Sequence, residues 1–371
     1  MTVQLDCWTE IDLAKIRGNV ATLLQHLNGP DMMAVVKANG YGHGSSEVAA
    51  AALTAGATWL GVARVEEGRL LRESGIDAPI LLLAEPPASR FGEVVELGLT
   101  AALYTNRGAE SLSRSAASMN QEAKVHVKID TGMHRYGLSP KRAEEFLDLL
   151  DSLPGIRATG IWTHFAVAED VVNPFTKQQF EKFIEVLEDL GPRTEGMIRH
   201  AGNSAAAIAY PESHLDMVRV GIAMYGIHPS PGLRDAIHLD PAMSIKARVG
   251  QVKPTAAGET LSYGRNYAMA TDGMVATVTA GYADGLRRGL TNSGEVLIRG
   301  RRYRISGTVT MDHFMVDVGD DEVLTDDEVV LVGAQGDEEI TAQEVADRLD
   351  TIPYEVVCDV GERVPRIYLN A

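Results

Sequence analysis

The chain has 371 residues, of which 45% are hydrophobic, and its formal net charge is −17. This length predicts two domains or one large barrel with an addition, and the apolar content excludes a largely disordered protein. The excess of acidic residues argues against a nucleic-acid groove or an anionic membrane surface as the partner.

Neither the termini nor the cysteines indicate export. The two cysteines, Cys7 and Cys358, are too few for a disulfide framework, which favours a reducing compartment. Residues 1–6 lack a basic segment followed by an apolar core, so no signal peptide is expected. No apolar run approaches the length of a membrane span. We therefore expect a cytoplasmic protein without a membrane segment.

The first two thirds of the chain alternate between short apolar runs and amphipathic stretches. A helical period over Leu13–Leu27 comes first. Strands are expected at Met32–Val36, Thr58–Val62, Pro79–Leu83, Thr100–Leu103, Lys124–Ile129, Ala158–Thr163, Met197–His200 and Asp216–Ile222. Helical patterns between them include Gly44–Ala55, Val65–Ser74, Lys141–Leu150 and Thr176–Leu190. Eight strands separated by helices predict an α/β fold with a (β/α)₈ TIM-type barrel over residues 1–240.

The pattern changes after Pro241, where strand-like runs follow one another closely and Gly- and Asp-rich turns separate them. These runs are Met243–Val252, Gly273–Thr279, Glu295–Arg299, Tyr303–Thr308, Phe314–Val318 and Val329–Val332. A helix over Ala342–Leu349 and the segment Ile352–Tyr354 follow. We expect a second, mainly β domain over residues 241–371.

The most informative motif is Val35–Gly44, in which an apolar run delivers Lys37 at the end of a strand and three glycines follow. Glycine allows the backbone to turn and to approach a ligand closely. Partial desolvation lowers the pKa of a lysine toward the range in which its neutral amine forms Schiff bases with a carbonyl cofactor. The alternative is a lysine that points into solvent.

Other chemically capable residues also fall at the ends of predicted barrel strands, the face that carries the active site in such barrels. They are Lys128, Asp130 and Arg135 at the fifth strand, His164 at the sixth, Asn203 and Ser204 after the seventh, and Arg219, Gly221 and Ile222 at the eighth. Taken singly, His164 fits a core histidine, Arg135 a surface charge and Lys128 a polar residue on a strand.

Ser204 fits two roles, since a serine at a helix start can cap the helix or offer donors to a phosphate. Barrels frequently bind phosphate beside the loops after strands seven and eight, where Ser204 and Gly221 fall. A reactive lysine and a phosphate site at the same end of a barrel indicate pyridoxal phosphate.

With these residues assembled, the chain resembles the alanine racemases, the fold-type III pyridoxal-phosphate enzymes, over essentially its full length. The motifs that carry the resemblance are Ala34–Gly44, Lys128–Met133 with Arg135, Asn203-Ser204, Arg219–Ile222, Ser262–Gly264, Gly281–Gly285, Met311-Asp312 and Pro353-Tyr354. The departures, which bear on substrate range, are His134, Gly202 and Asn266.

The resemblance implies a role for each matching residue. Lys37 and Tyr263 would be the two catalytic bases, on opposite faces of the substrate. The cofactor would be held by Lys37, Tyr41, His164, Asn203, Ser204, Arg219, Gly221, Ile222 and Tyr354. The substrate would meet Arg135, Met311, Lys128 (a position that can be carbamylated in relatives), Tyr282 and Asp170. No metal is implied.

The implied activity is the interconversion of L- and D-alanine, which supplies D-alanine for peptidoglycan synthesis, although alanine catabolism stays open. The implied assembly is a homodimer in which Tyr263 serves the partner subunit's site. The alternatives are a racemase of broad specificity, a barrel-type amino-acid decarboxylase, and a single-barrel cofactor carrier. The domain after Pro241 and its Tyr263 argue against the carrier.

Overall fold

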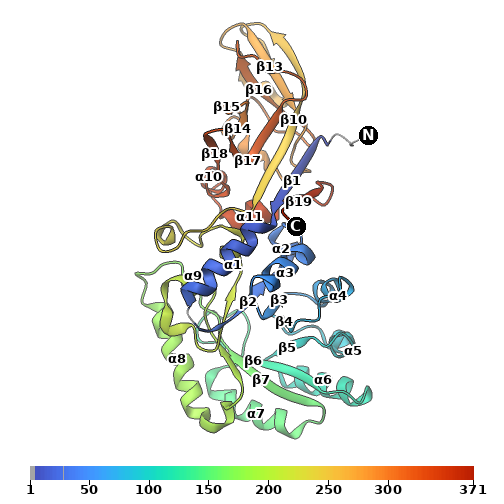
Figure 1. The fold of residues 1–371 in the computed structure, drawn as a ribbon, viewed down its shortest axis with the longest axis vertical. Helices are drawn as coiled ribbons and strands as arrows, with labels where there is room; N and C mark the ends of the chain where they lie inside the picture. Colours follow the sequence, from blue (N-terminus) through green and yellow to red (C-terminus); the bar gives the residue numbers. More distant parts are fainter. Residues whose placement is uncertain (1–4, 28) are drawn as a thin grey trace. The chain divides into compact units, whose positions relative to one another are not determined.

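The computed structural model describes residues 5–27 and 29–371, and the chain divides into two compact units. The barrel unit comprises Lys15–Gly40 and Gly44–Asp240, and the β unit comprises the described residues up to Ala14, Tyr41–His43 and Pro241–Ala371. Figure 1 follows the chain through both. The expected absence of a signal peptide rests partly on residues 1–4, which lie outside the described residues. Within the described chain, no helix has the length and apolar character needed to cross a membrane.

The barrel unit is built on a sheet of parallel strands that winds into a nearly closed barrel. Its strands in the described chain are β2 (Asp31–Val35), β3 (Trp59–Val62), β4 (Ile80–Leu82), β5 (Thr100–Leu103), β6 (Ala123–Lys128), β7 (Ile156–Trp162), β8 (Ile198–His200) and β9 (Met217–Val220). Each strand from β2 to β8 pairs with the next and β9 pairs with β2, while no strand ladder among the described residues joins β8 to β9. Backbone hydrogen bonds from Arg219 N to Gly202 O (2.9 Å) and from Asp216 N to Arg199 O (3.1 Å) join β8 to β9.

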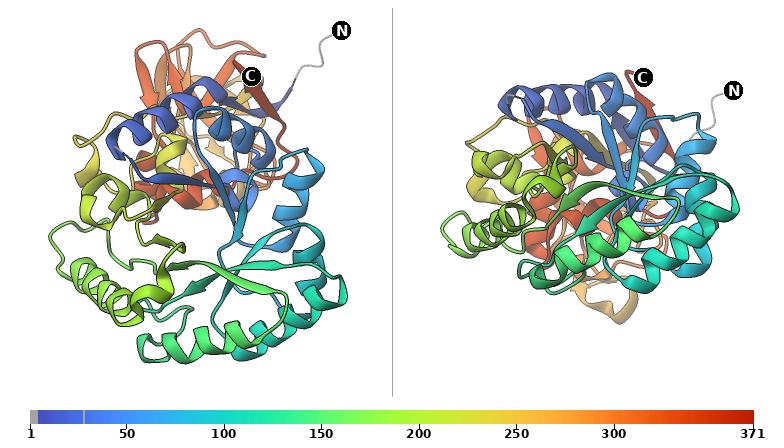
Figure 2. Two further views of the ribbon diagram at one scale, coloured as in Figure 1. Left: turned by 60° about the horizontal axis from the view of Figure 1, so that its bottom comes forward. Right: turned by 90° about the horizontal axis from the view of Figure 1, so that it is seen from below.

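Helices follow the strands and cover the outside of the barrel, as both views in Figure 2 show. They are α1 (Leu13–Leu27), α3 (Ser45–Thr54), α4 (Val65–Glu73), α5 (Phe91–Glu96), α6 (Asn106–Ser118), α7 (Ala143–Ser152), α8 (Phe175–Leu190) and α9 (Ser204–Ala209), whereas the segment labelled α2 (Lys37–Tyr41) is a left-handed turn. The strands read as continuous apolar runs because both of their faces are buried. The (β/α)₈ barrel predicted from the sequence is confirmed.

The β unit is mainly a nine-stranded sheet in the described chain. Its strands are β1 (Cys7–Asp12), β10 (Met243–Thr255), β13 (Gly273–Val278), β14 (Glu295–Ile298), β15 (Arg301–Arg304), β16 (Phe314–Gly319), β17 (Glu328–Gln335), β18 (Glu338–Ile340) and β19 (Arg366–Leu369). A small ladder of β11 (Thr260–Leu261) and β12 (Tyr267–Ala268) and the helices α10 (Ala342–Arg348) and α11 (Pro353–Cys358) complete it. The predicted mainly β character is confirmed.

Several strands of this unit differ from the sequence prediction, which gave none at the short strands β11, β12 and β18. No strand was predicted for β1, which pairs with both β10 and β19. The run predicted at Tyr303–Thr308 starts earlier, at Arg301, because Arg299 (φ 52°) and Gly300 (φ 73°) form a tight hairpin turn that pairs Ile298 with Arg301.

Candidate active site

The backbone adopts the left-handed conformation immediately after Lys37, at the carboxyl end of β2. Ala38 (φ 53°), Asn39 (φ 53°), Gly40 (φ 59°) and Tyr41 (φ 51°) are all left-handed. For residues other than glycine this conformation costs about 1–2 kcal/mol each. Such strain persists only where surrounding contacts hold it, and it gathers at functional sites.

Hydrogen bonds hold this left-handed turn. Gly40 N donates to Val36 O (2.9 Å), and Gly44 N donates to Asn39 O (2.8 Å). Ala38 N donates to Oε1 of Glu67, on helix α4, at 2.6 Å. Lys37 therefore lies at the start of a turn whose shape is held partly by Glu67 on helix α4.

Arg219, on β9, is a buried charge at this end of the barrel, with 3% of its surface exposed. Its Nη2 lies 2.9 Å from Thr163 O, 2.8 Å from Ala201 O and 3.0 Å from Nδ1 of His164. Its Nη1 lies 3.1 Å from Nδ1 of His200. A guanidinium only donates, so both imidazoles must accept at Nδ1, which leaves their protons on Nε2.

The two histidines beside Arg219 are held neutral. Burial, followed by the positive charge of Arg219, lowers the pKa of His164 well below its ordinary value. The same two causes lower the pKa of His200. Nε2 of His200 lies 2.9 Å from Nδ1 of His126, so a chain of hydrogen bonds runs from Arg219 into the barrel interior.

Lys128 ends β6 and is also buried, with 3% of its surface exposed. Burial and the positive charges of Arg219, Arg135 and Lys37 lower the pKa of Lys128 to about 7, opposed by the carboxylate of Asp130. Part of the Lys128 population therefore carries a neutral amine at neutral pH. The positive charges of Arg219, Arg135 and Lys37 thus act on the amine of Lys128.

Trp162 packs against two members of this cluster. Lys128 Nζ lies 4.3 Å from the centre of the Trp162 ring, and the Arg219 guanidinium carbon lies 4.6 Å from it. The electron-rich face of an indole attracts cations, so Trp162 partly offsets the repulsion between them. Sequence reasoning did not single out this residue.

The cap of helix α9 is Asn203, whose Oδ1 accepts from the backbone N–H groups of Ala205 and Ala206, both at 3.1 Å. The N-cap role considered for Ser204 therefore belongs to its neighbour. Ser204 is buried, and its Oγ accepts from Gly221 N at 2.9 Å. This bond joins the loops after β8 and β9, which puts a hydroxyl beside the backbone at Gly221 and Ile222.

The loop after β6 carries Arg135, which is exposed. Asp130 organises this loop, because its Oδ1 accepts from Gly132 N and His134 N, both at 3.0 Å. His134, one of the departures from the family pattern, has φ 56°, and its Nδ1 lies 3.3 Å from Asp130 Oδ2. Asp170 is exposed in the loop after β7.

Gln179, on α8, was missed by the sequence analysis although it is fully buried. Its amide nitrogen donates to His164 O (3.1 Å) and Thr131 Oγ1 (3.3 Å), and its oxygen accepts from Ala166 N (2.8 Å). Gln179 thus fixes the loop that carries His164 to the loop after β6.

In the β unit, three of the predicted site residues have exposed side chains. They are Tyr263 (76% exposed), Met311 (52%) and Tyr282 (44%). Thr308 Oγ1 donates to Tyr263 O at 2.7 Å, and Tyr282 N donates to Thr310 O at 3.0 Å. The three side chains therefore come from loops that are hydrogen-bonded to a common segment, residues 308–311.

Tyr41 and Tyr354 also belong to the β unit, and their ring centres lie 6.2 Å apart at an interplanar angle of 51°. Gly42 (φ 82°) follows Tyr41, and a Cβ there would lie 2.1 Å from Val357 O. A residue other than glycine cannot occupy this position without moving the backbone, which explains one glycine of the Val35–Gly44 motif.

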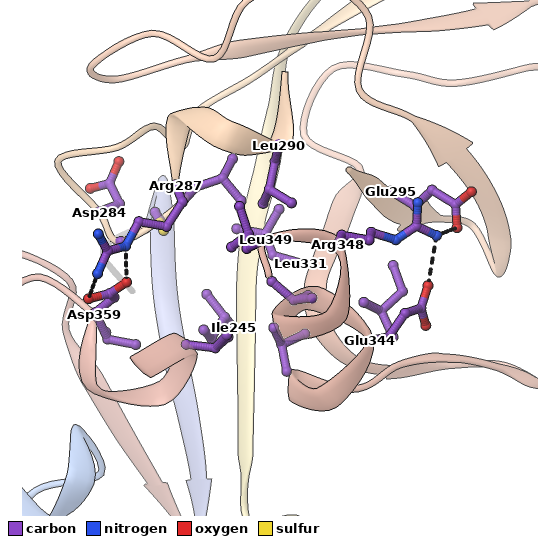
Figure 3. Close-up of a pocket in the computed structure, with 18 residues that line it drawn as sticks. Ile245, Asp284, Arg287, Leu290, Glu295, Leu331, Glu344, Arg348, Leu349 and Asp359 are labelled. Atoms are coloured by element: carbon purple, nitrogen blue, oxygen red, sulfur yellow. Dashed lines mark hydrogen bonds and ion pairs between the residues drawn. The ribbon is translucent and has the colours of Figure 1, made fainter. Parts of the chain in front are cut away.

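A separate pocket lies inside the β unit (Figure 3). Its apolar lining includes Ile245, Leu290, Leu331 and Leu349. The charged side chains at its edges pair with one another, Arg287 with Asp359 (2.7 Å) and Arg348 with Glu295 (2.8 Å). Because these charges are already matched, they offer a ligand little, and the barrel end is the stronger candidate.

Comparisons with known proteins agree over both units. The model of the alanine racemase N-terminal domain matches residues 11–229, and that of the C-terminal domain matches residues 242–368. The alanine racemase of Symbiobacterium thermophilum is 47% identical over 363 residues, which cover 97% of this chain and 96% of that protein.

Solved structures show the same likeness. The alanine racemase from Bacillus anthracis, solved with bound L-Ala-P, has a TM-score of 0.94 at 36% identity and covers 100% of this chain and 96% of its own. The histidine racemase from Leuconostoc mesenteroides has a TM-score of 0.91 at 28% identity and covers 98% of both chains. The two family models together match most of the chain, and a full-length relative is 47% identical to it. These findings confirm the predicted relationship: the chain belongs to the alanine racemase family of isomerases.

Proposed function

We propose that this protein interconverts L-alanine and D-alanine with pyridoxal 5'-phosphate as its cofactor. The observation that carries the proposal is the placement of Lys37 after β2, Lys128 at the end of β6, Arg135 in the loop after β6 and Arg219 on β9, all toward the carboxyl end of the barrel strands. The proposed role is the supply of D-alanine for peptidoglycan synthesis. The two cysteines of the chain are too few for a disulfide framework, which supports the cytoplasm as the place of action.

The residues at this end of the barrel fit an anionic, phosphorylated aldehyde. Burial is the largest cause of the lowered pKa of Lys128, the positive charges of Arg219, Arg135 and Lys37 add to it, and the carboxylate of Asp130 opposes them. Buried charge of one sign is costly unless a counter-ion is present, and a phosphate supplies one. Ser204 Oγ accepts from the Gly221 amide and keeps its own hydroxyl proton, which it could donate to a phosphate.

The proposal assigns each contact to residues of this chain. Lys37 would bind the aldehyde, and Arg219 and His164 would contact the ring. The phosphate would be held by Ser204, by the backbone N–H groups of Gly221 and Ile222, and by Tyr41, Asn203 and Tyr354. When bound, the cofactor would withdraw electrons from the substrate Cα and so make its proton acidic.

Two bases on opposite faces would move that proton. Lys37 would take it from or return it to one face of Cα, and Tyr263 would do so on the other. Tyrosine has a pKa near 10, so Tyr263 needs nearby cations or hydrogen bonds to act as a base. We propose that Tyr263 acts in the partner subunit's site, and a homodimer is then the functional unit. Its 76% exposure in the single chain supports this.

The substrate would be positioned by its carboxylate. Arg135 would pair with that carboxylate, and Met311 would contribute to the same subsite. A carbamate on Lys128 would supply an anion that fixes Arg135, and the lowered pKa of Lys128 favours the neutral amine that such a reaction needs. Tyr282 and Asp170 would line the path of entry. In this arrangement residues 1–240 carry the cofactor and residues 241–371 carry the second base.

A panel of substrates tests the proposal. The purified protein, supplied with pyridoxal phosphate, is incubated separately with L-alanine, L-serine and L-histidine, and the D-isomer is measured by chiral chromatography. D-Alanine should form fastest. Faster formation of D-histidine would indicate that the protein is a histidine racemase, like the Leuconostoc relative. Release of carbon dioxide would indicate a decarboxylase, and no turnover at all would indicate a cofactor carrier.

A further inference from the structure

Glu67 makes contacts in two different loops at the carboxyl end of the barrel. It lies in the first turn of α4, and its Oε2 accepts from Ala63 N (2.7 Å) and Arg64 N (3.0 Å). Those two bonds are ordinary for an acidic residue that caps its own helix. Its Oε1 accepts from Ala38 N at 2.6 Å, and Ala38 precedes it by 29 residues. Helix capping does not require this third bond.

The bond between Ala38 N and Glu67 lies at the point where the backbone becomes left-handed. Ala38 is the first left-handed residue after Lys37, and both Ala38 and Asn39 are exposed. Packing around these two side chains therefore contributes little to the shape of the turn. Hydrogen bonds to an ionised carboxylate are shorter and stronger than those between neutral groups, so Glu67 is suited to hold a strained amide.

We propose that Glu67 is a positioning residue for Lys37. By holding the amide that directly follows Lys37, its carboxylate keeps the turn left-handed and so fixes the direction in which Lys37 leaves the backbone. A side chain whose direction is fixed before binding loses less conformational freedom when it engages its ligand. This inference rests on the proposed cofactor role of Lys37.

The test compares Glu67→Gln with Asp216→Asn. Asp216 offers a matched control in the same unit, because its carboxylate also accepts a backbone N–H, that of Arg199 at 2.8 Å, but it lies before β9 and so at the opposite end of the barrel. Two quantities are measured: the hydrogen exchange of the peptide that spans residues 36–41 without added cofactor, and the affinity for pyridoxal phosphate from its visible absorbance.

Glu67→Gln should speed exchange of the Ala38 amide by about tenfold, because the turn opens more often. It should weaken binding of pyridoxal phosphate by about tenfold, while Asp216→Asn changes neither quantity. If the two variants have the same exchange rate and the same affinity, Glu67 acts only as a helix cap and the proposal is overturned. Faster exchange without weaker binding would overturn it as well.

A second variant, Glu67→Asp, tests the proposal in case Glu67→Gln does not fold. Glu67→Asp keeps the charge and the capping chemistry, but withdraws the carboxylate from Ala38 by one methylene. It should change both quantities in the same direction as Glu67→Gln, and wild-type affinity in this variant would contradict the proposal. If the wild-type protein gives no visible absorbance with pyridoxal phosphate, the proposed function fails, whereas the exchange data still report whether Glu67 holds the turn.

Discussion

Arg219 donates to Nδ1 of His164 across 3.0 Å, and this contact determines where the proton of the imidazole lies. Because an arginine has no acceptor, the neutral His164 must carry its proton on Nε2. Burial and the charge of Arg219 hold the pKa of His164 well below its ordinary value, so the ring stays neutral. Arg219 thus sets the charge and the tautomer of its neighbour at once.

This relationship predicts the nitrogen NMR spectrum of the histidines. His164 and His200 should both appear as neutral rings protonated on Nε2, and neither should titrate between pH 5 and pH 8. The measurement is a pH series on protein with ¹⁵N-labelled histidine, assigned through His164→Gln and His200→Gln. A ring of this pair that titrates near its ordinary pKa, about 6.5, would refute the assignment.

Lys128 predicts a dependence of stability on pH. Its pKa is lowered to about 7 in the folded protein, whereas an unfolded lysine has a pKa of about 10.4. Between these values the unfolded chain binds more protons, so the free energy of unfolding from this group rises with pH. The penalty is fully present below pH 7 and is relieved toward pH 10, by at most about 5 kcal/mol.

Lys128→Met should therefore stabilise the protein most at pH 6–7 and remove this part of the pH slope, as measured by urea unfolding without added cofactor. Lys124→Met is the matched control, because Lys124 is the exposed lysine of the same strand. It should leave the slope as in the wild type. A Lys128→Met variant with an unchanged slope would show that Lys128 keeps its charge in the folded state.

The contact between Ser204 and Gly221 predicts how the phosphate is held. Ser204→Ala should weaken binding of pyridoxal phosphate by about tenfold, which corresponds to one hydrogen bond, and should leave binding of pyridoxal without phosphate unchanged. Visible absorbance titrations with both compounds measure this. Ser213→Ala is the control, since Ser213 is equally buried but donates to Tyr210 O at 2.8 Å. An equal loss of affinity for pyridoxal would show that Ser204 does not bind the phosphate.

Much of the barrel could be predicted from the sequence because its strands are apolar on both faces. The runs predicted to end at Val36, Ile129 and His200 locate the carboxyl ends of β2, β6 and β8 to within one residue. Parallel strands must present these ends on one face, which is why reactive residues from distant positions could be grouped correctly at the same end.

Other features depend on contacts that the sequence does not display. Glycine signals a left-handed backbone at Gly40, but nothing in the sequence marks Ala38, whose amide donates to Glu67 on helix α4. The environments of Lys124 and Lys128 differ only through closure of the barrel, since both are lysines on one alternating strand. Strand β1 was missed because its partners, β10 and β19, lie more than 200 residues away.

The central claim is that Lys37 of one subunit and Tyr263 of the partner form one active site. Lys37→Ala should abolish the visible absorbance of bound cofactor. Tyr263→Phe should keep that absorbance and the stability, because the Tyr263 side chain is exposed, but should lose proton transfer at one face. Each variant alone is therefore expected to be inactive in racemisation.

Coexpression of the two variants with different affinity tags tests this claim most directly. A mixed dimer would contain one site that lacks both bases and one site that is intact. Random assembly makes half of the dimers mixed, so we predict about one quarter of the wild-type racemase activity, all of it in the doubly tagged fraction. A doubly tagged dimer with no activity would show that both bases come from one chain and would contradict the account.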